Sequence, residues 1–221
     1  MPSEPLRGLY AVTPQSADTE ALVAACVACL EGGAALLQYR AKALEPALAL
    51  LQARRLADAC RAHGVPFIVN DSIPLALACL ADGVHVGRDD ASVREARIAF
   101  PTGIVGASCY ADPALARDAR RDGADYVAVG SMFASPTKPA APAAPLAVIA
   151  AAREASGLPV VAIGGITTHN APAAIAAGAD MLAVISALFD ASDIRAAARA
   201  FSRLFDGPHG EMNVRAQPRA V

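Results

Sequence analysis

Short apolar segments alternate with longer segments of mixed polarity along most of this chain. Typical apolar segments are LYAV at residues 9–12 and VVAI at residues 160–163. Continuous apolar runs of this length are typical of strands that are buried on both faces of a parallel sheet. The pattern predicts eight strands, over residues 9–12, 35–39, 67–69, 84–86, 104–107, 126–129, 160–163 and 181–185.

The segments between these strands carry the signals of helices. Asp18 or Thr19 can cap a first helix that Gly32 and Gly33 end, while a second helix begins near Pro46. Related turns (HGVP, ADGV, DGADY and AGADM) each lead from a helix into a strand. The first predicted helix ends near residue 30. The other predicted helices cover residues 46–63, 73–81, 91–99, 113–121, 146–155, 170–177 and 192–205.

Repeating strand–helix units of this number and length predict an α/β fold, a single-domain (β/α)8 TIM barrel over residues 1–205. A chain of 221 residues is a common size for such a barrel. An open doubly wound sheet is the structural alternative, but no GxGxxG follows the first strand. Residues 206–221 are polar and contain Gly and Pro, so we expect a flexible C-terminal tail there.

Two carboxylates follow neighbouring predicted strands. Asp71 comes directly after the third strand, next to Asn70, and Asp90 lies shortly after the fourth. Because the carboxyl ends of parallel strands open on one face, both aspartates are expected on the same rim. Such a pair suits Mg²⁺ that is shared with the phosphates of a substrate. The alternative is that each aspartate caps the helix that follows it.

Other polar residues at the predicted strand exits suit phosphate binding. The basic group after the second strand is either an anion site or a solvated turn, and the long segment 130–144 is either functional or a plain surface loop. Cations beside a carboxylate-held Mg²⁺ neutralise the charge of a departing diphosphate, which suggests group transfer between two phosphorylated small molecules. The strand-exit residues that suit phosphate binding are Gln38, Arg40, Lys42, Asn70, Ser108, Ser135, Thr137, Lys138, Gly165 and Ser186.

Composition narrows the class of protein. The net charge of −2 and the 5% aromatic content, without Trp, argue against nucleic acid or an acidic membrane as partner. The chain lacks a membrane-length apolar run and a signal-like N-terminus, which predicts a soluble cytoplasmic protein. Its five scattered cysteines favour reduced thiols, with Cys26 and Cys29 as small buried hydrophobes. His85, between two valines of a strand, is expected to be structural.

Six segments together closely resemble the thiamine-phosphate synthase (thiamine-phosphate pyrophosphorylase) family: QYRAK, FIVND, ADGVHVGRDD, GADYVAVGSMFASPTK, PVVAIGGI and GADMLAVIS. They occur in the family's order and at consistent spacing between residues 9 and 189. The resemblance implies a (β/α)8 transferase that uses Mg²⁺ and is typically a homodimer. Its substrates would be 4-amino-2-methyl-5-(diphosphooxymethyl)pyrimidine and 4-methyl-5-(2-phosphoethyl)thiazole, or the carboxylated thiazole, and its products thiamine phosphate and diphosphate.

The resemblance also implies a role for each matching residue. Asp71 and Asp90 would hold Mg²⁺, while Lys138, Ser108 and Arg40 would act catalytically. The implied mechanism is dissociative: diphosphate leaves first, and the thiazole nitrogen captures the resulting pyrimidine-methyl cation. The residues implied to bind the two substrates are Gln38, Tyr39, Arg40, Ala41, Lys42, Asn70, Ser108, Ser135, Pro136, Thr137, Lys138, Gly165, Ile185 and Ser186.

Two other functions fit the same barrel. A thiazole tautomerase would need a proton-transfer His just beyond the fifth strand, where Cys109 and Tyr110 stand instead. A non-catalytic phosphate-binding paralogue would lack Lys138 or one of the two aspartates, Asp71 and Asp90. All three residues are present. The chain also departs from the usual family pattern at Arg88, where a neutral Gln is common.

Overall fold

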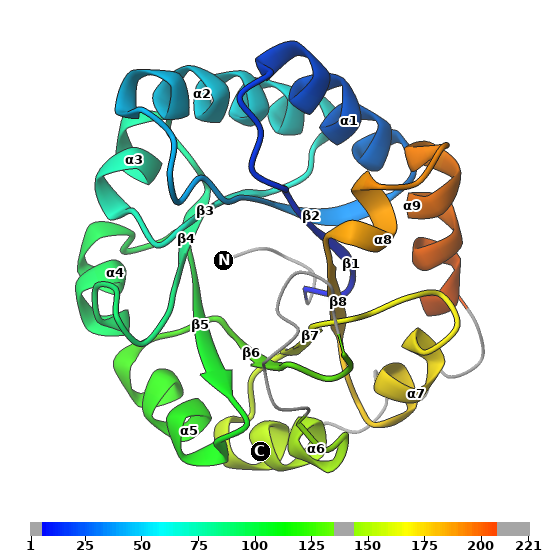
Figure 1. Cartoon of the computed structure of the whole chain (residues 1–221). Coiled ribbons are helices and arrows are strands. Elements are labelled where there is room, and N and C mark those ends of the chain that lie inside the picture. The colour runs from blue at the N-terminus through cyan, green and yellow to red at the C-terminus, as the bar shows by residue number, and fades with distance from the viewer. Residues whose placement is uncertain (1–5, 135–143, 207–221) are drawn as a thin grey trace.

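The computed structural model describes residues 6–134 and 144–206 of the chain. Eight parallel strands form a closed barrel in which each strand pairs with the next and β8 pairs with β1 (Figure 1). This confirms the predicted (β/α)8 barrel. The strands are β1 (Gly8–Val12), β2 (Ala34–Tyr39), β3 (Phe67–Asn70), β4 (Gly83–Val86), β5 (Ile104–Tyr110), β6 (Tyr126–Gly130), β7 (Val160–Ile163) and β8 (Met181–Val184).

A ring of helices surrounds the barrel (Figure 1). None of the helices in the described part of the chain is both long and apolar enough to cross a membrane. The helices are α1 (Thr19–Glu31), α2 (Pro46–His63), α3 (Ile73–Ala78), α4 (Val93–Ala99), α5 (Pro113–Asp122), α6 (Ala147–Ser156), α7 (Ala171–Ala176), α8 (Ser186–Phe189) and α9 (Ile194–Ser202), with a 3₁₀ turn at Arg203–Phe205.

Local signals at the helix ends operate as the sequence predicts. The Asp18 side chain accepts a hydrogen bond from the backbone N–H of Ala21 and caps α1. Gly64 ends α2 in the left-handed conformation, with φ of 67°, which glycine adopts without a steric cost. The predicted bounds of α2 and β7 coincide with the observed ones.

The core has two parts, because successive strand residues face opposite sides of the sheet. One cluster fills the space between strands and helices, and a smaller one fills the barrel interior. The interior cluster includes Leu36 on β2, Ile68 on β3 and Ile104 on β5. With the period of two, Gln38, Asn70 and Ser108 therefore also face inward, at the end of the barrel where the strands finish.

Most predicted bounds differ from the observed ones by one to three residues, and three of the differences have a clear local reason. Helix α3 ends at Ala78 instead of residue 81, since Leu80 takes a left-handed backbone with φ of 56°. Strand β5 continues to Tyr110 through an irregularity in register, so Ser108 lies within the strand rather than after it. Strand β8 ends at Val184, and the short helix α8, which was not predicted, follows. The predicted C-terminal tail lies outside the described residues, apart from Asp206.

Three of the four related turns in the sequence share one function at the other end of the barrel. Asp82, Asp125 and Asp180 each lie just before an even-numbered strand. Their carboxylates accept a backbone N–H from the start of β3, β5 and β7, at 2.8, 2.7 and 2.7 Å. Each aspartate thus ties the start of one strand to the turn before the next, which explains why Asp recurs in these turns.

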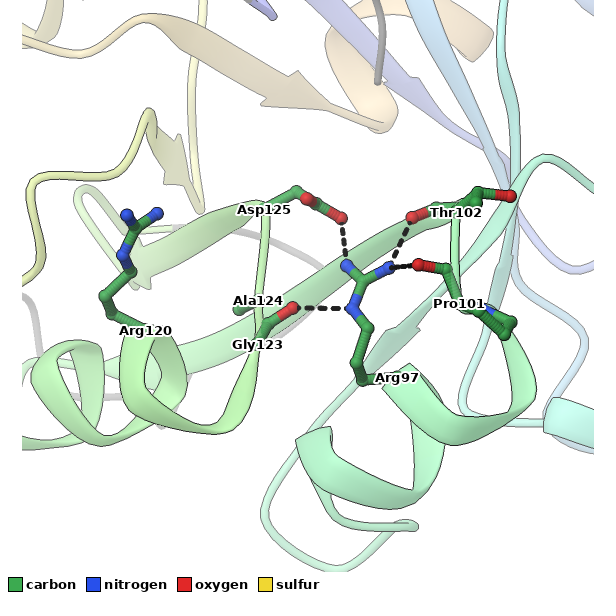
Figure 2. A pocket seen from close by; sticks show the side chains of 8 residues that line it. Arg97, Pro101, Thr102, Arg120, Gly123, Ala124 and Asp125 are labelled. Atoms are coloured by element: carbon green, nitrogen blue, oxygen red, sulfur yellow. Dashed lines mark hydrogen bonds and ion pairs between the residues drawn. The ribbon is translucent and has the colours of Figure 1, made fainter.

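A pocket of about 470 Å³ also lies at this end, between α4 and the turn before β6 (Figure 2). Its central side chain is Arg97, which pairs with Asp125 at 2.5 Å. The same guanidinium donates to the backbone oxygens of Phe100, Gly103 and Gly123, at 2.6, 2.8 and 2.9 Å. Because these bonds join three chain segments, Arg97 has a structural role. The predicted site lies at the opposite end, where the strands finish.

Candidate active site at the carboxyl ends of the strands

Neither predicted metal-binding aspartate serves as a helix cap. The side chain of Ser72 accepts the backbone N–H three residues on and caps α3. Ser92 does the same for α4, as part of a reciprocal capping box with Glu95. The capping explanation for Asp71 and Asp90 is therefore wrong, and their carboxylates are available for another purpose.

Asp71 lies in a strained and partly buried position. Its backbone has φ of 64°, a left-handed value that is uncommon for a residue with a side chain. Its N–H donates to the backbone oxygen of His85 at 2.8 Å, which holds the residue against the end of β4. Backbone strain of this kind often marks a functional position.

The Asp71 carboxylate faces one cation and one anion. Lys42 Nζ lies 3.0 Å from Asp71 Oδ2. Burial raises the pKa of the Asp71 carboxyl, the Lys42 hydrogen bond lowers it, and the neighbouring Asp90 carboxylate raises it again. The structure thus brings Lys42, Asp71 and Asp90 together, with more negative than positive charge, and a bound cation would relieve the repulsion between the two carboxylates.

The donor set fits Mg²⁺ better than a metal enclosed by protein ligands. Among the described residues, no group of three or more His, Cys, Asp or Glu side chains could hold a metal ion. Mg²⁺ commonly takes one or two carboxylates and completes its octahedron with water and substrate phosphate oxygens. Asp71 and Asp90 supply that minimal oxygen pair. One oxygen of Asp90 also accepts the N–H of Gly87 at 2.8 Å, which orients the carboxylate.

The end of β2 is joined to the end of β1. The Arg40 backbone N–H donates to Thr13 Oγ1, and the Thr13 backbone N–H donates to the backbone oxygen of Gln38, both at 2.9 Å. Gln38 is buried inside the barrel, and its Nε2 donates to the hydroxyl of Tyr10 at 2.6 Å. These bonds set where the basic segment from Arg40 to Lys42 leaves the strand.

Two residues that the resemblance placed at the substrates point elsewhere. Tyr39 belongs to the outer core, and its hydroxyl donates to Gln52 Oε1 on α2 at 2.8 Å. Ala41 also packs against the outer core. The structure does not bring the side chain of Tyr39 to the mouth of the barrel. Adjacent residues of a strand face opposite sides, so the inward position of Gln38 already required this.

His85 is a neighbour of the site, although its place between two valines predicted only a structural role. Its ring lies inside the barrel, with Nε2 2.8 Å from Ser108 Oγ and Nδ1 3.0 Å from the Tyr126 hydroxyl. Burial lowers the pKa of His85 to about 4, and the field of Asp90 opposes that shift. The imidazole is therefore neutral at physiological pH. In the structure His85 is in register with Asn70, an inward position at the mouth.

This burial predicts a pH-dependent stability. An unfolded His85 binds a proton below its ordinary pKa of about 6.5, but the folded one does so only below a pKa of about 4. The contribution of His85 to the free energy of unfolding is fully present above the pKa of the unfolded state. It decreases as the pH falls towards the pKa of the folded state. We expect a loss of about 2 kcal/mol in the free energy of unfolding between about pH 7.5 and about pH 5.

Urea unfolding of the wild type and of His85→Gln at both pH values measures this contribution. We expect the variant to be less stable at both pH values, but its decrease in the free energy of unfolding between them should be smaller by that amount. An equal decrease in the two proteins would contradict a neutral, buried His85.

The glycine exit of β7 packs against the segment that follows β6. Gly164 and Gly165 have φ of 102° and 61°. The N–H groups of Met132 and Phe133 donate to the oxygens of Ile163 and Gly164, at 2.9 and 3.0 Å. A Cβ on Gly165 would lie 2.4 Å from the backbone oxygen of Ala134. Glycine is required here because two backbones approach each other closely.

The remaining predicted residues lie at the same end of the barrel or outside the described residues. Ile185 packs against the interior core, and Ser186 begins α8 directly after β8. The loops after the seventh and eighth strands and a short extra helix often bind phosphate in such barrels. Four predicted residues lie outside the described residues: Ser135, Pro136, Thr137 and Lys138. The described ends of their segment are joined by the N–H of Ala144, which donates to Ser131 at 2.6 Å.

Comparison with known proteins agrees with this geometry. The family described as "Thiamine monophosphate synthase" matches residues 9–188. A thiamine-phosphate synthase from Thiobacillus denitrificans is 57% identical over 199 residues, which cover 90% of this chain and 94% of the relative. One from Methylobacillus flagellatus is 54% identical, covering 91% of this chain and 97% of the relative.

Two solved structures also superpose on this chain. The thiamine phosphate pyrophosphorylase from Pyrococcus furiosus superposes with a TM-score of 0.80 and 34% identity, covering 90% of this chain and 95% of that one. A 3-hexulose-6-phosphate synthase superposes with a TM-score of 0.67 and 22% identity, covering 89% of this chain and 99% of that one. The second likeness, at this identity, concerns the fold alone.

Proposed function

This chain belongs to the thiamine monophosphate synthase family, and we propose that the mouth of its barrel joins the pyrimidine diphosphate to the thiazole phosphate. The thiazole substrate is 4-methyl-5-(2-phosphoethyl)thiazole or its carboxylated form. The products are thiamine phosphate and diphosphate, together with CO₂ when the carboxylated form is used. The similarity runs along nearly the whole length of the synthases it matches. The observation in the structure that carries the proposal is the Asp71–Asp90 pair, held together beside Lys42 and not used to cap a helix.

The proposed reaction replaces one bond at the pyrimidine methylene carbon. The carbon–oxygen bond to diphosphate breaks first, and the electron pair leaves with the diphosphate. The thiazole nitrogen then forms the new carbon–nitrogen bond to the resulting cation. No protein nucleophile is needed for this sequence, so positioning and stabilisation of the leaving group supply the rate.

Asp71 and Asp90 would hold Mg²⁺. When bound there, the ion would offset the negative charge of the departing diphosphate. Lys42 lies beside these carboxylates and supplies positive charge on the same side of the mouth. We assign Arg40 and Lys138 the same electrostatic task, and Gln38, Asn70 and Ser108 the orientation of the pyrimidine. The proposed contacts of the thiazole phosphate are Ser135, Thr137, Gly165, Ile185 and Ser186.

The main alternative is tautomerisation of the thiazole phosphate on the same barrel. The structure places Tyr110 just beyond Ser108, with its hydroxyl accepting the N–H of Arg88 at 3.2 Å and its ring under the Arg88 guanidinium. Position 110 therefore holds a tyrosine that contacts the β4–α4 loop, and not a histidine. Proton NMR of the carboxylated thiazole phosphate with the protein alone tests this alternative. We expect no isomerisation, and turnover without the pyrimidine substrate would favour the isomerase.

We also propose a cytoplasmic homodimer. The family resemblance supports the dimer. Exposed apolar side chains on three successive helices, and on the turn after one of them, also support it. The fraction exposed ranges from 48% to 77% for this group, which consists of Leu51, Leu77, Leu80 and Ile98. Light scattering of the purified chain measures its mass in solution, and a monomer at every concentration would contradict the dimer.

A further inference from the structure

A chain of buried polar side chains runs beneath the mouth, inside the barrel. Gln38 on β2 donates to the hydroxyl of Tyr10 on β1 at 2.6 Å. The Tyr10 and Tyr126 hydroxyls are 2.7 Å apart. His85 continues the chain, 3.0 Å from Tyr126 and 2.8 Å from Ser108 on β5. The two ends, Gln38 and Ser108, are both proposed contacts of the pyrimidine diphosphate.

Gly106 provides the space that the chain occupies. It lies on β5 in register with His85 on β4 and with Tyr126 on β6. A Cβ at this position would lie 2.1 Å from Tyr126 Cζ and 2.6 Å from His85 Nδ1. Without it, the two rings stack across β5 with centroids 5.6 Å apart. Because Gly106 has no side chain, residues from the two strands that flank β5 can meet inside the barrel.

The hydrogen-bond inventory sets the direction of the chain. Burial raises the pKa of both tyrosines, so each keeps one hydrogen to donate. Tyr10 already accepts from Gln38. If Tyr10 also accepted from Tyr126, its own hydrogen would have no acceptor among the described residues. A buried donor without a partner is costly, so Tyr10 donates to Tyr126, which donates to Nδ1 of His85.

The tautomer of His85 follows from this direction. A neutral imidazole has one N–H, and here Nδ1 is an acceptor, so the hydrogen is on Nε2. Nε2 then donates to the oxygen of Ser108. The Ser108 hydroxyl keeps its own hydrogen for an acceptor outside the chain, at the mouth where the proposed substrate binds.

We propose that His85, Tyr126 and Tyr10 are positioning residues that hold Ser108 as a hydrogen-bond donor, and Gln38 in a fixed orientation, before the pyrimidine diphosphate binds. The assignment rests on the proposed function, which supplies the substrate contacts of Gln38 and Ser108. Groups that are oriented in the free enzyme lose little freedom when the substrate arrives, and this increases the rate. None of the three positioning residues is required to touch substrate.

The His85 tautomer can be measured without turnover. Nitrogen-15 NMR of the uniformly labelled, full-length protein, with the His85 signals assigned by their loss in His85→Gln, distinguishes the two neutral tautomers. We expect the Nε2–H form in the wild type and a mixture of the two forms in Tyr126→Phe, which lacks the hydroxyl that donates to Nδ1. A wild-type His85 in the Nδ1–H form, or in the charged form near neutral pH, would overturn the proposal.

A double-mutant cycle tests the effect on catalysis. We expect Tyr126→Phe to lower kcat/KM for the pyrimidine diphosphate about tenfold, with KM for the thiazole phosphate unchanged. In a Ser108→Ala background the same change should cost less than about twofold. Tyr126 reaches Ser108 through His85, whereas Gln38 keeps its own hydrogen bond to Tyr10 in either background. An equal loss in both backgrounds, or wild-type kinetics of Tyr126→Phe, would overturn the proposal.

A matched control separates positioning from general stability. Ser156→Ala removes a buried hydroxyl that ends α6 and donates to Ala152 at 2.7 Å, outside the barrel interior. It should lower stability but leave kcat/KM and the His85 tautomer unchanged. A comparable tenfold kinetic loss in this control would attribute the Tyr126 effect to stability and overturn the proposal. A wild type that forms no thiamine phosphate would refute the proposed function, while the NMR result would still test the hydrogen-bond chain.

Discussion

Asp71→Asn and Asp90→Asn should each lower kcat/KM for the pyrimidine diphosphate by about 100-fold or more. Each change keeps the shape of the side chain but removes one of two charges that lie together at the mouth. A departing diphosphate carries several negative charges, so loss of the cation that offsets them would raise the free energy of the transition state. Calorimetric titration of Mg²⁺, in the presence of inorganic diphosphate, should show weaker binding to both variants.

The loop itself offers a matched control. Asp89 is exposed and adjacent to Asp90, so Asp89→Asn makes the same change of charge one residue away. It should retain the kinetics and the Mg²⁺ affinity of the wild type. Equal activity of all three variants would show that the Asp71–Asp90 pair is not the metal site.

Gly165→Ala should raise KM for the thiazole phosphate at least about tenfold. The new Cβ would lie 2.4 Å from the Ala134 oxygen and 2.6 Å from the Phe133 oxygen. Both contacts are backbone atoms, so the segment after β6 would have to move as a whole. That segment leads into the residues proposed to bind the thiazole phosphate, and steady-state kinetics with each substrate varied in turn would locate the effect.

Gly157→Ala separates the steric clash from the backbone strain. Gly157 has nearly the same φ, 66° against 61° at Gly165, but a Cβ there would meet no atom within 4 Å. Alanine at this position should cost about 1 kcal/mol of stability, because left-handed backbone disfavours a side chain. Its KM for the thiazole phosphate should equal that of the wild type. Similar KM values for the two variants would mean that the contact of Gly165 with Ala134 has no role in substrate binding.

The fold followed from local signals that the structure confirms. Apolar runs of strand length, a cap at Asp18 and a left-handed end at Gly64 are properties of neighbouring residues, and they sufficed to place the repeating units. The common rim of Asp71 and Asp90 followed from the parallel direction of their strands. The competing explanation of these aspartates failed by a single position at Asp71 and by two at Asp90, because Ser72 and Ser92 cap the helices instead.

The features that were missed depend on contacts between distant strands. The position of His85 beneath Ser108 depends on Tyr126 from another strand and on the absent side chain of Gly106 between them. No spacing within one segment reveals such an arrangement. The outward direction of Tyr39 is different, because strand alternation with an inward Gln38 is enough to indicate it.

One measurement tests the central claim most directly. The purified full-length protein is mixed with the pyrimidine diphosphate, the thiazole phosphate and Mg²⁺, and thiamine phosphate and diphosphate are quantified over time. The account predicts both products in equal amounts, no product when Mg²⁺ is chelated, and recovery when Mg²⁺ is returned. A folded protein that forms no thiamine phosphate under these conditions, or forms it at an undiminished rate without a divalent cation, would contradict the account.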